Sequence, residues 1–481
     1  MSEERPRLGK EEESDVMIAN IRRSYEDLDG TELKVCLLSL SIFPENAAIK
    51  KRPLIYWWIG EGFITSTKEK RAEEIGQEIF EKLMRKDLIQ PGAGEPNCEL
   101  LVKSCTMHPW IRRMLISLAS EARLFHFDSI WPMMPSYSMK KYGRACFVSK
   151  DPEYVKPIAE VTGAEFDTLL TLFNVNVRYL DLEQKRLEEL KKVEVLQLGR
   201  WQNSPTHHIE VEHGRSVGAS SAEGILYGLG AQKYLKDLSL RGISRITHLP
   251  DSILNLISLE ILDLRACHDL EKLPPDISSL KKLTHLDVSE CFLLEAMPKG
   301  LQKLASLQVL KGFLIGTLKK TPCRLGELAK LKNLRRLSIH IGNEAFVQPG
   351  EFTKLEGVTS LRHLKISWGV LSSNFKDKID KESEKLSFPP NLEKLDLQGF
   401  PIQNLPDGLK PSKLKKLKKL YIMGGELSSL SHGEPNEHWK VEILRLHFLK
   451  KLKSPMLSVS GKVDLPSLKR EFPCIQYWAV S

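Results

Sequence analysis

A repeated leucine pattern in the C-terminal half of the chain constrains its fold more than any other feature. Paired apolar residues, one position apart, recur at Leu238 and Leu240, Leu262 and Leu264, Leu286 and Val288, Leu337 and Ile339, Leu364 and Ile366, Leu395 and Leu397, Leu420 and Ile422, and Leu444 and Leu446. Leu262, Leu286 and Leu310 each follow the previous start by 24 residues, and the later steps are 27, 27, 31, 25 and 24 residues. Such self-similarity indicates stacked, repeated units.

Each period contains a strand and a return segment. The apolar pair marks a strand whose alternate side chains point inward, and the return reads L-P-x-x-I-x-x-L-x-x-L. One complete return is Leu249, Pro250, Ile253, Leu256 and Leu259. Steps of about 20 to 29 residues are typical of leucine-rich repeats. The pattern therefore predicts an α/β leucine-rich-repeat solenoid, a horseshoe, over residues 179–481, with loop insertions in the longer steps.

Cysteines and histidines in the repeat region are interpreted as structural or solvated. Cys267 and Cys291 fall at the same repeat position, where this class of repeat uses Asn or Cys to tie the turn to the next coil. None of the eight cysteines forms a C-x-x-C pair, which argues against a zinc or redox site. The His-rich stretch 202–221 is predicted to be a surface loop without a metal.

The N-terminal segment has the order of a winged helix. Residues 31–43 predict a buried helix ended by Pro44, and residues 53–59 predict a second helix. A third helix is capped by Thr65 or Thr67, and a hairpin follows around the turn 91–94. We therefore divide the chain into four segments: a disordered tail over 1–23, a winged-helix domain over 24–119, a connector and repeat N-cap over 120–178, and the solenoid.

The run CLLSLSIFPENAAI, followed by LIYWWIGEGFI, closely resembles plant nucleotide-binding leucine-rich-repeat disease resistance proteins of the coiled-coil type. The resemblance covers about residues 24–120 and continues through the repeats. It implies a winged-helix domain and a role in plant innate immunity, as a receptor-like or regulatory scaffold. In that family the domain closes with a Met-His-Asp motif, whose histidine reaches the nucleotide phosphates. This chain has Met107, His108 and Pro109 at the matching place.

The sequence departs from the family in two respects: Pro109 replaces the acidic residue of the Met-His-Asp motif, and the P-loop is missing. No G-x-x-x-x-G-K-[ST] motif occurs, so we expect no nucleotide-binding domain and no cofactor. His108 would lie beside a nucleotide only if a P-loop domain were supplied by another chain, and we expect it to act as a helix cap or packing residue. The chain is then either a P-loop-less family member or a C-terminal fragment of a full ADP/ATP-switched receptor.

Partner proteins are expected on the concave face, where outward strand residues of successive repeats align. Arg, His, Tyr and Trp at exposed positions are typical of interface hot spots. The candidate protein-binding residues are Arg241, Arg265, His285, Asp287, Arg336, His340, His363, Lys365, Trp368, Tyr421 and Arg445. The resemblance implies that the partner is a pathogen effector, a guarded host protein or another resistance protein.

Other functional classes find little support in the sequence. No catalytic motif occurs, so we expect neither an enzyme nor a small-molecule substrate. No apolar run reaches the roughly 18 to 20 residues of a membrane span, and we expect a cytoplasmic protein. The net charge of +9 leaves a DNA-binding winged helix as the alternative, but acids roughly balance bases in the third helix. The lysines of residues 410–419 are predicted to lie on a solvated repeat surface.

Overall fold

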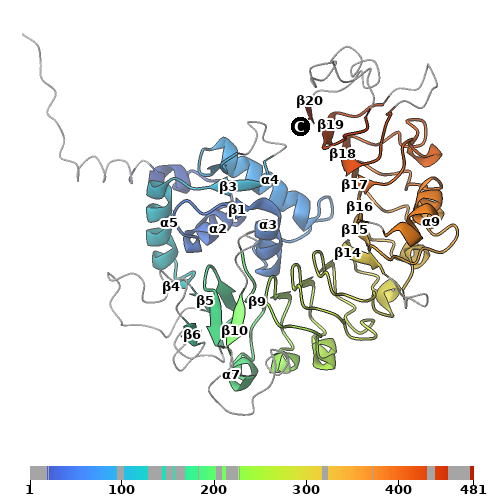
Figure 1. Cartoon of the computed structure of the whole chain (residues 1–481). Helices are drawn as coiled ribbons and strands as arrows, with labels where there is room; N and C mark the ends of the chain where they lie inside the picture. Colours follow the sequence, from blue (N-terminus) through green and yellow to red (C-terminus); the bar gives the residue numbers. More distant parts are fainter. Residues whose placement is uncertain are drawn as a thin grey trace, which may run out of the picture. The chain divides into compact units, whose positions relative to one another are not determined.

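The computed structural model describes residues 19, 21–94, 102–127, 143–147, 155–157, 168–181, 184–201, 209–212, 226, 228–316, 323–370, 372–430, 439–452 and 477–480. These residues belong to two compact units, Met1–Ser244 and Arg245–Ser481 (Figure 1). Most of the predicted tail 1–23 and most of the predicted loop 202–221 lie outside the described residues.

The first unit begins with the winged helix. After a helical turn over 21–26 come α2 (Thr31–Ser39), which continues as the 3₁₀ turn η1 (Leu40–Ile42), then α3 (Lys51–Gly60), α4 (Ala72–Arg85) and α5 (Pro109–Glu121). A small antiparallel sheet has the order β1 (Ile49–Lys50), β3 (Ser104–Thr106), β2 (Gln90–Pro91). The predicted order of helices and hairpin is therefore confirmed.

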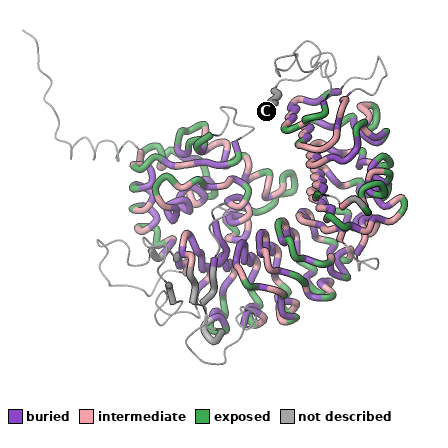
Figure 2. Tube along the Cα trace, in the orientation of Figure 1, coloured by how far each residue is buried: buried purple, intermediate pink, exposed green. Residues whose placement is uncertain are grey.

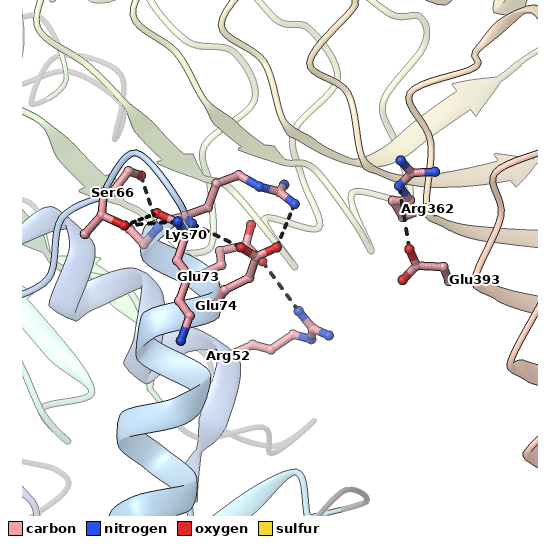
Figure 3. A network of polar contacts seen from close by, with 10 residues as sticks. Arg52, Ser66, Lys70, Glu73, Glu74, Arg362 and Glu393 are labelled. Atoms are coloured by element: carbon pink, nitrogen blue, oxygen red, sulfur yellow. Dashed lines mark hydrogen bonds and ion pairs between the residues drawn. The ribbon is translucent and has the colours of Figure 1, made fainter. Parts of the chain in front are cut away.

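The start of α4 differs from the prediction. Its N-cap is Arg71, whose backbone N–H donates to Glu74 Oε2 at 3.1 Å (Figure 3). Thr67 closes a turn before the helix, because its Oγ1 accepts hydrogen bonds from the N–H groups of Glu69 and Lys70. Ser66 Oγ accepts from the N–H of Ala72 at 3.1 Å. Both threonines have the right chemistry for a cap, but the turn made by Thr67 delays the helix by several residues.

Parallel strands complete the first unit. β4 (His126–Phe127), β5 (Arg144–Phe147), β7 (Thr171–Asn174), β9 (Val195–Gln197) and β11 (Asp237–Ser239) form one ladder. A second ladder contains β6 (Val155–Pro157), β8 (Tyr179–Asp181) and β10 (Glu210–Glu212). The remaining elements are α7 (Gln184–Glu189) and η5 (Gly228–Ala231). Parallel pairing thus starts at β4, inside the segment predicted to be a connector and cap.

The second unit is a stack of parallel strands, each paired with the next, as expected for a leucine-rich-repeat solenoid. The strands are β12 (Ile261–Asp263), β13 (His285–Asp287), β14 (Val309–Ile315), β15 (Arg336–Ile341), β16 (His363–Trp368), β17 (Lys394–Phe400), β18 (Lys419–Gly425), β19 (Ile443–His447) and β20 (Tyr477–Val480). The predicted fold class is confirmed.

Return segments of the second unit are mostly 3₁₀ turns. They are η6 (Asp251–Asn255), η7 (Leu301–Lys303), η8 (Leu325–Lys330), η9 (Phe352–Gly357) and η10 (Asp407–Leu409). The 31-residue step between Leu364 and Leu395 contains α9 (Ser373–Ser383). The extra length predicted as a loop is therefore partly a helix.

The inward leucines of the second unit stack in register and form its core. Leu337, Leu364, Leu395, Leu420 and Leu444 pair in sequence across five strands, and each is at most 2% exposed. Among the strand pairs whose register the structure describes in this unit, the register shifts between Leu310 and Phe313 of β14. Gly312 lies there at φ +82°, and a Cβ on it would come within 2.5 Å of the carbonyl carbon of Val288. Only glycine fits this bulge without strain.

Two local predictions for the repeats are confirmed. Cys267 and Cys291 are buried, and the Cys291 thiol donates to the carbonyl oxygen of Leu264 at 3.2 Å, which ties one coil to the previous one. Burial raises the pKa of the Cys291 thiol, so it stays protonated. In residues 410–419, Leu414 and Leu417 are buried while Lys413, Lys415 and Lys416 are exposed. Among the described residues, no helix is both long and apolar enough to cross a membrane.

Candidate functional site

Strand alternation in the second unit divides side chains between the core and an outward face. Along β15, Leu337, Ile339 and Ile341 are buried while the residues between them are half-buried (Figure 2). β16 and the first part of β17 and β18 follow the same pattern. We define the outward face as Arg336, Ser338, His340, His363, Lys365, Ser367, Lys394, Asp396, Gln398, Lys419, Tyr421, Met423, Ile443, Arg445 and His447.

The in-register pairing arranges this face in columns. Arg336, His363, Lys394 and Lys419 pair in that order across β15 to β18 and form the first column. Neighbouring strands lie about 4.8 Å apart, so the backbone positions that carry adjacent side chains of a column are separated by about this distance. The second column is Ser338, Lys365, Asp396, Tyr421 and Arg445. The site is therefore a regular array of mostly basic groups.

Tyr421 occupies the centre of the charged part of this face. The Lys394 Nζ lies 4.4 Å from the centroid of the Tyr421 ring, and the Arg445 Cζ lies 5.1 Å from it. Each contact is a cation–π interaction, which holds a flexible cationic side chain against a rigid ring. Cations from both columns are thereby held in defined positions, and groups held in this way lose less entropy when they bind a ligand.

His340 begins a third column, which continues through Ser367, Gln398, Met423 and His447. Its Nδ1 is 3.1 Å from Ser367 Oγ. Burial and the neighbouring charge of Lys365 lower the pKa of this imidazole. His340 therefore offers a neutral hydrogen-bonding ring at neutral pH, beside the charges of the other columns.

A separate ion cluster lies on β12 to β14. Lys311 Nζ is 2.7 Å from Asp287 Oδ2, and the Arg265 guanidinium binds the Glu290 carboxylate. The N–H of Ser289 donates to Asp287 Oδ1 at 3.0 Å. Burial alone would raise the pKa of Asp287, but Lys311, Arg265 and the hydrogen bonds to Ser289 lower it below its ordinary value. Arg265 and Asp287 are therefore held by partners within the chain.

We expect Asp287→Asn to reduce stability in a pH-dependent way. The folded-state pKa of Asp287 is lowered, so ionisation stabilises the fold above the unfolded-state value of about 3.9 and this contribution is lost as the pH falls below it. Urea unfolding of wild type and variant should show the largest difference near neutral pH and a shrinking difference below about pH 4. A difference that is the same at all pH values would contradict the assignment.

Three of the predicted binding residues are buried. Trp368 is 7% exposed and packs edge-on against Phe400, with ring centroids 5.4 Å apart, because it continues the inward series of Leu364 and Ile366. His285 points outward but is 6% exposed, and its strand partners Ile261 and Val309 are also buried. These positions were wrongly predicted to be accessible.

Arg241 is the third. It is 3% exposed and belongs to the first unit, where its backbone lies directly against the preceding coil. A Cβ on Gly199 would come within 2.2 Å of the Arg241 backbone N. The Arg200 N–H donates to the Arg241 carbonyl at 2.7 Å. The Arg241 side chain is therefore not accessible, contrary to the prediction.

In the first unit the winged helix itself covers the outward strand positions. Leu172, Leu196 and Leu238 share one register, so Thr171 and Phe173 of β7 point to the opposite, outward side. The Phe173 ring lies 4.5 Å from that of Trp57 in α3 and 6.1 Å from that of Phe43 (centroid distances). Trp201 completes this aromatic cluster, 5.3 Å from Phe173.

A buried polar contact fixes the same interface. Glu61, at the end of α3, has a side chain only 1% exposed. Its Oε2 accepts hydrogen bonds from Arg144 Nε at 2.8 Å and Thr171 Oγ1 at 3.0 Å. Its Oε1 accepts from Trp57 Nε1 at 2.8 Å. The winged helix is thus joined to β5 and β7 by both apolar and charged groups.

His108 lies at the N-terminus of α5. Its Nδ1 accepts a hydrogen bond from the N–H of Trp110 at 3.3 Å, and Pro109 occupies the first turn. The interpretation of His108 as a helix cap is confirmed. It makes this contact within the winged helix, and no nucleotide is needed for it.

Sequence reasoning missed two groups of residues. Lys394 and Asp396 flank Leu395 on β17, so strand alternation alone would have placed them on the outward face. The aromatic contact between Trp57 and Phe173 had no such signal, since it joins segments more than a hundred residues apart.

Comparisons with known proteins agree with this architecture. Residues 219–476 match the family model described as "Leucine-rich repeat region", and residues 42–115 match "Disease resistance protein Winged helix domain". Disease resistance RPP13-like protein 4 of Arabidopsis thaliana is 31% identical over 113 residues, 24% of this chain and 13% of that protein. Disease resistance protein PIK6-NP of Oryza sativa subsp. japonica is 29% identical over 188 residues, 36% of this chain and 17% of that protein.

Among solved structures, a leucine-rich-repeat protein of Leptospira interrogans, LIC12759, matches with a TM-score of 0.32 and 18% identity, over 65% of this chain and 78% of that one. The match to the two plant relatives spans less than a fifth of their length.

Proposed function

Because the chain belongs to the leucine-rich-repeat family and carries the winged-helix domain of disease resistance proteins, we propose that it acts in plant defence by binding a partner protein through its outward face. The observation that carries the proposal is the in-register array on β15 to β19, in which charged, aromatic and hydrogen-bonding groups alternate with the core leucines. Stacked repeats present such continuous surfaces to macromolecular partners.

The proposed role is that of a scaffold without chemistry of its own, acting in the cytoplasm. The partner is a pathogen effector, a host protein or another resistance protein. The winged helix has a structural part in this scheme, since its α3 packs on β7 and β5 of the same unit. A DNA-binding role gains no support from α4, whose exposed residues include Glu74 and Glu78.

The double variant Arg336→Glu plus Tyr421→Ala tests the proposal. Arg336 and Tyr421 belong to the first and second columns, so charge reversal and loss of the ring remove contacts from both. Tagged wild type and variant would be purified from infected and healthy plant tissue, and their partners identified by mass spectrometry. We expect the variant to lose at least one wild-type partner, with affinity reduced about tenfold or more.

A matched control is Lys415→Glu plus Tyr234→Ala. Both residues are exposed, and neither belongs to the outward face. The control should retain the wild-type partners. Identical partners for wild type, variant and control would refute binding through the outward face.

A further inference from the structure

We propose that the outward face recognises an acidic segment of its protein partner, with the first column, Arg336, His363, Lys394 and Lys419, as the principal contact. This inference rests on the proposed function and specifies the chemistry of the partner. It is carried by three features of the described strands: the sign of the charge, its spacing, and the polar and apolar groups between the charges.

The outward face has a strong excess of positive charge. Over the described strands β15 to β19 it carries five side chains of Lys or Arg, which are Arg336, Lys365, Lys394, Lys419 and Arg445. Asp396 is the one carboxylate among these outward positions. The chain as a whole has 71 basic and 62 acidic residues, so this imbalance is a local property of the face. By charge complementarity, this local excess of cations favours a negatively charged ligand over a positively charged one.

The spacing of the charges suits an extended ligand that crosses the strands. The first column supplies one cationic or imidazole side chain per strand on four consecutive strands, about 4.8 Å apart. Adjacent side chains on one side of an extended peptide lie about 6.8 Å apart. Long Lys and Arg side chains accommodate the difference, so alternate Glu or Asp residues of a partner segment can each meet a cation.

The groups between the charges favour a protein over a nucleic acid. Tyr421 and the 36% exposed Met423 lie beside the cations of β17 and β18 and offer apolar contact area. Ser338, Ser367 and Gln398 supply hydrogen-bonding groups suited to peptide and side-chain amides. Arg and Tyr are enriched in protein interfaces. A site built for phosphates would gain nothing from Asp396, which lies in the second column between Lys365 and Tyr421.

Asp396 also gives the face selectivity. Gln398 Nε2 donates to Asp396 Oδ1 at 3.3 Å, which positions the carboxylate. A partner residue at this point must be basic or a hydrogen-bond donor, because an acid there would be repelled. The preferred ligand is thus an acidic segment interrupted by one such residue.

Fluorescence anisotropy with full-length protein tests the charge requirement directly. The probe is fluorescein-labelled poly-L-glutamate, titrated at about 50 mM and about 200 mM NaCl. The test variant is the triple Arg336→Gln, Lys394→Gln, Lys419→Gln, and the matched control is Lys281→Gln, Lys413→Gln, Lys415→Gln, which removes the same charge from exposed positions outside the face. We expect the test variant to bind about tenfold or more weakly and the control to stay within about twofold of wild type.

Three further variants address the aromatic ring and folding. Tyr421→Phe keeps the ring that contacts Lys394 and Arg445 and should retain binding, whereas Tyr421→Ala should weaken it. The double variant Lys394→Gln, Lys419→Gln gives an intermediate loss if the triple variant is poorly folded. Circular dichroism of each variant checks the fold.

Several outcomes would overturn the inference. They are the absence of poly-L-glutamate binding at low salt, equal loss in the control triple, and tighter binding of a DNA duplex with the same sensitivity to the test variant. Failure here is distinguishable from failure of the proposed function. If poly-L-glutamate does not bind but Arg336→Glu plus Tyr421→Ala still loses its partner in plant tissue, the face binds a partner of other chemistry.

Discussion

Trp57→Ala should destabilise the first unit by about 3–5 kcal/mol, the usual cost of removing a large buried aromatic side chain. Trp57 is 2% exposed and its ring lies within 6.1 Å of the rings of Phe43, Phe125, Phe173 and Trp201 (centroid distances). The substitution would leave a cavity in place of the indole ring. Because α3 and β7 meet through this cluster, the cavity would lie where the winged helix packs on the strands.

Hydrogen exchange under native conditions measures this loss locally. The amides of β7 and β9 should exchange faster by the factor that corresponds to the lost stability, about 10² to 4 × 10³. Tyr234→Ala is the control, since Tyr234 is 60% exposed, and should change stability by no more than about 0.5 kcal/mol. A Trp57→Ala variant with less than about 1 kcal/mol of destabilisation would show that the aromatic cluster does not hold the two parts together.

Glu61→Ala is expected to have a comparable effect, about 3–5 kcal/mol, for a different reason. Glu61 is the carboxylate partner of Arg144, whose side chain is 22% exposed, and it also accepts from Trp57 and Thr171. Its removal leaves a largely buried guanidinium without that counter-charge. The loss would be measured by urea unfolding and by the exchange of β5 amides.

A double variant separates the ion pair from packing. Glu61→Leu plus Arg144→Met removes both charges, so it should be less destabilised than Glu61→Leu alone. As a comparison, Lys236→Ala breaks the more exposed pair with Glu194, at 40% and 35% side-chain exposure, and should cost about 0.2–1 kcal/mol. Equal destabilisation by the Glu61→Leu single and the double variant would exclude an uncompensated charge as the cause.

The sequence predicted the solenoid because its periodicity is a direct consequence of stacking. One coil cannot bury its own leucines, so neighbouring coils must carry apolar residues at equivalent positions. This repetition can be recognised directly in the sequence. The inward residues followed from alternation, as at Leu337 and Ile339. The same rule, applied with care, excludes Trp368 and includes Lys394 in the outward face.

The solvent exposure of a strand side chain was harder to predict than the side of the strand on which it lies. His285 points outward as expected, but it is buried, as are its strand partners Ile261 and Val309 in the neighbouring coils. The contact between the winged helix and β7 could not be predicted from sequence patterns, for a related reason. Phe173 lies in an irregular strand without the repeat pattern, and its partners Trp57 and Phe43 are distant in sequence. Local patterns report which side a residue faces, and they do not report what covers that side.

The bulge at Gly312 marks a position in the solenoid at which a block of repeats could be exchanged. Lys311 and Gly312 lie between the paired residues Leu310 and Phe313 of β14, whereas β15 has a single residue in the corresponding interval. The bulge therefore accommodates one extra residue in β14. The strands from β15 to β19 therefore share one continuous register after the bulge. Under the proposed function, exchanging these coils as a block would change the outward face while the strands before the bulge keep their pairing.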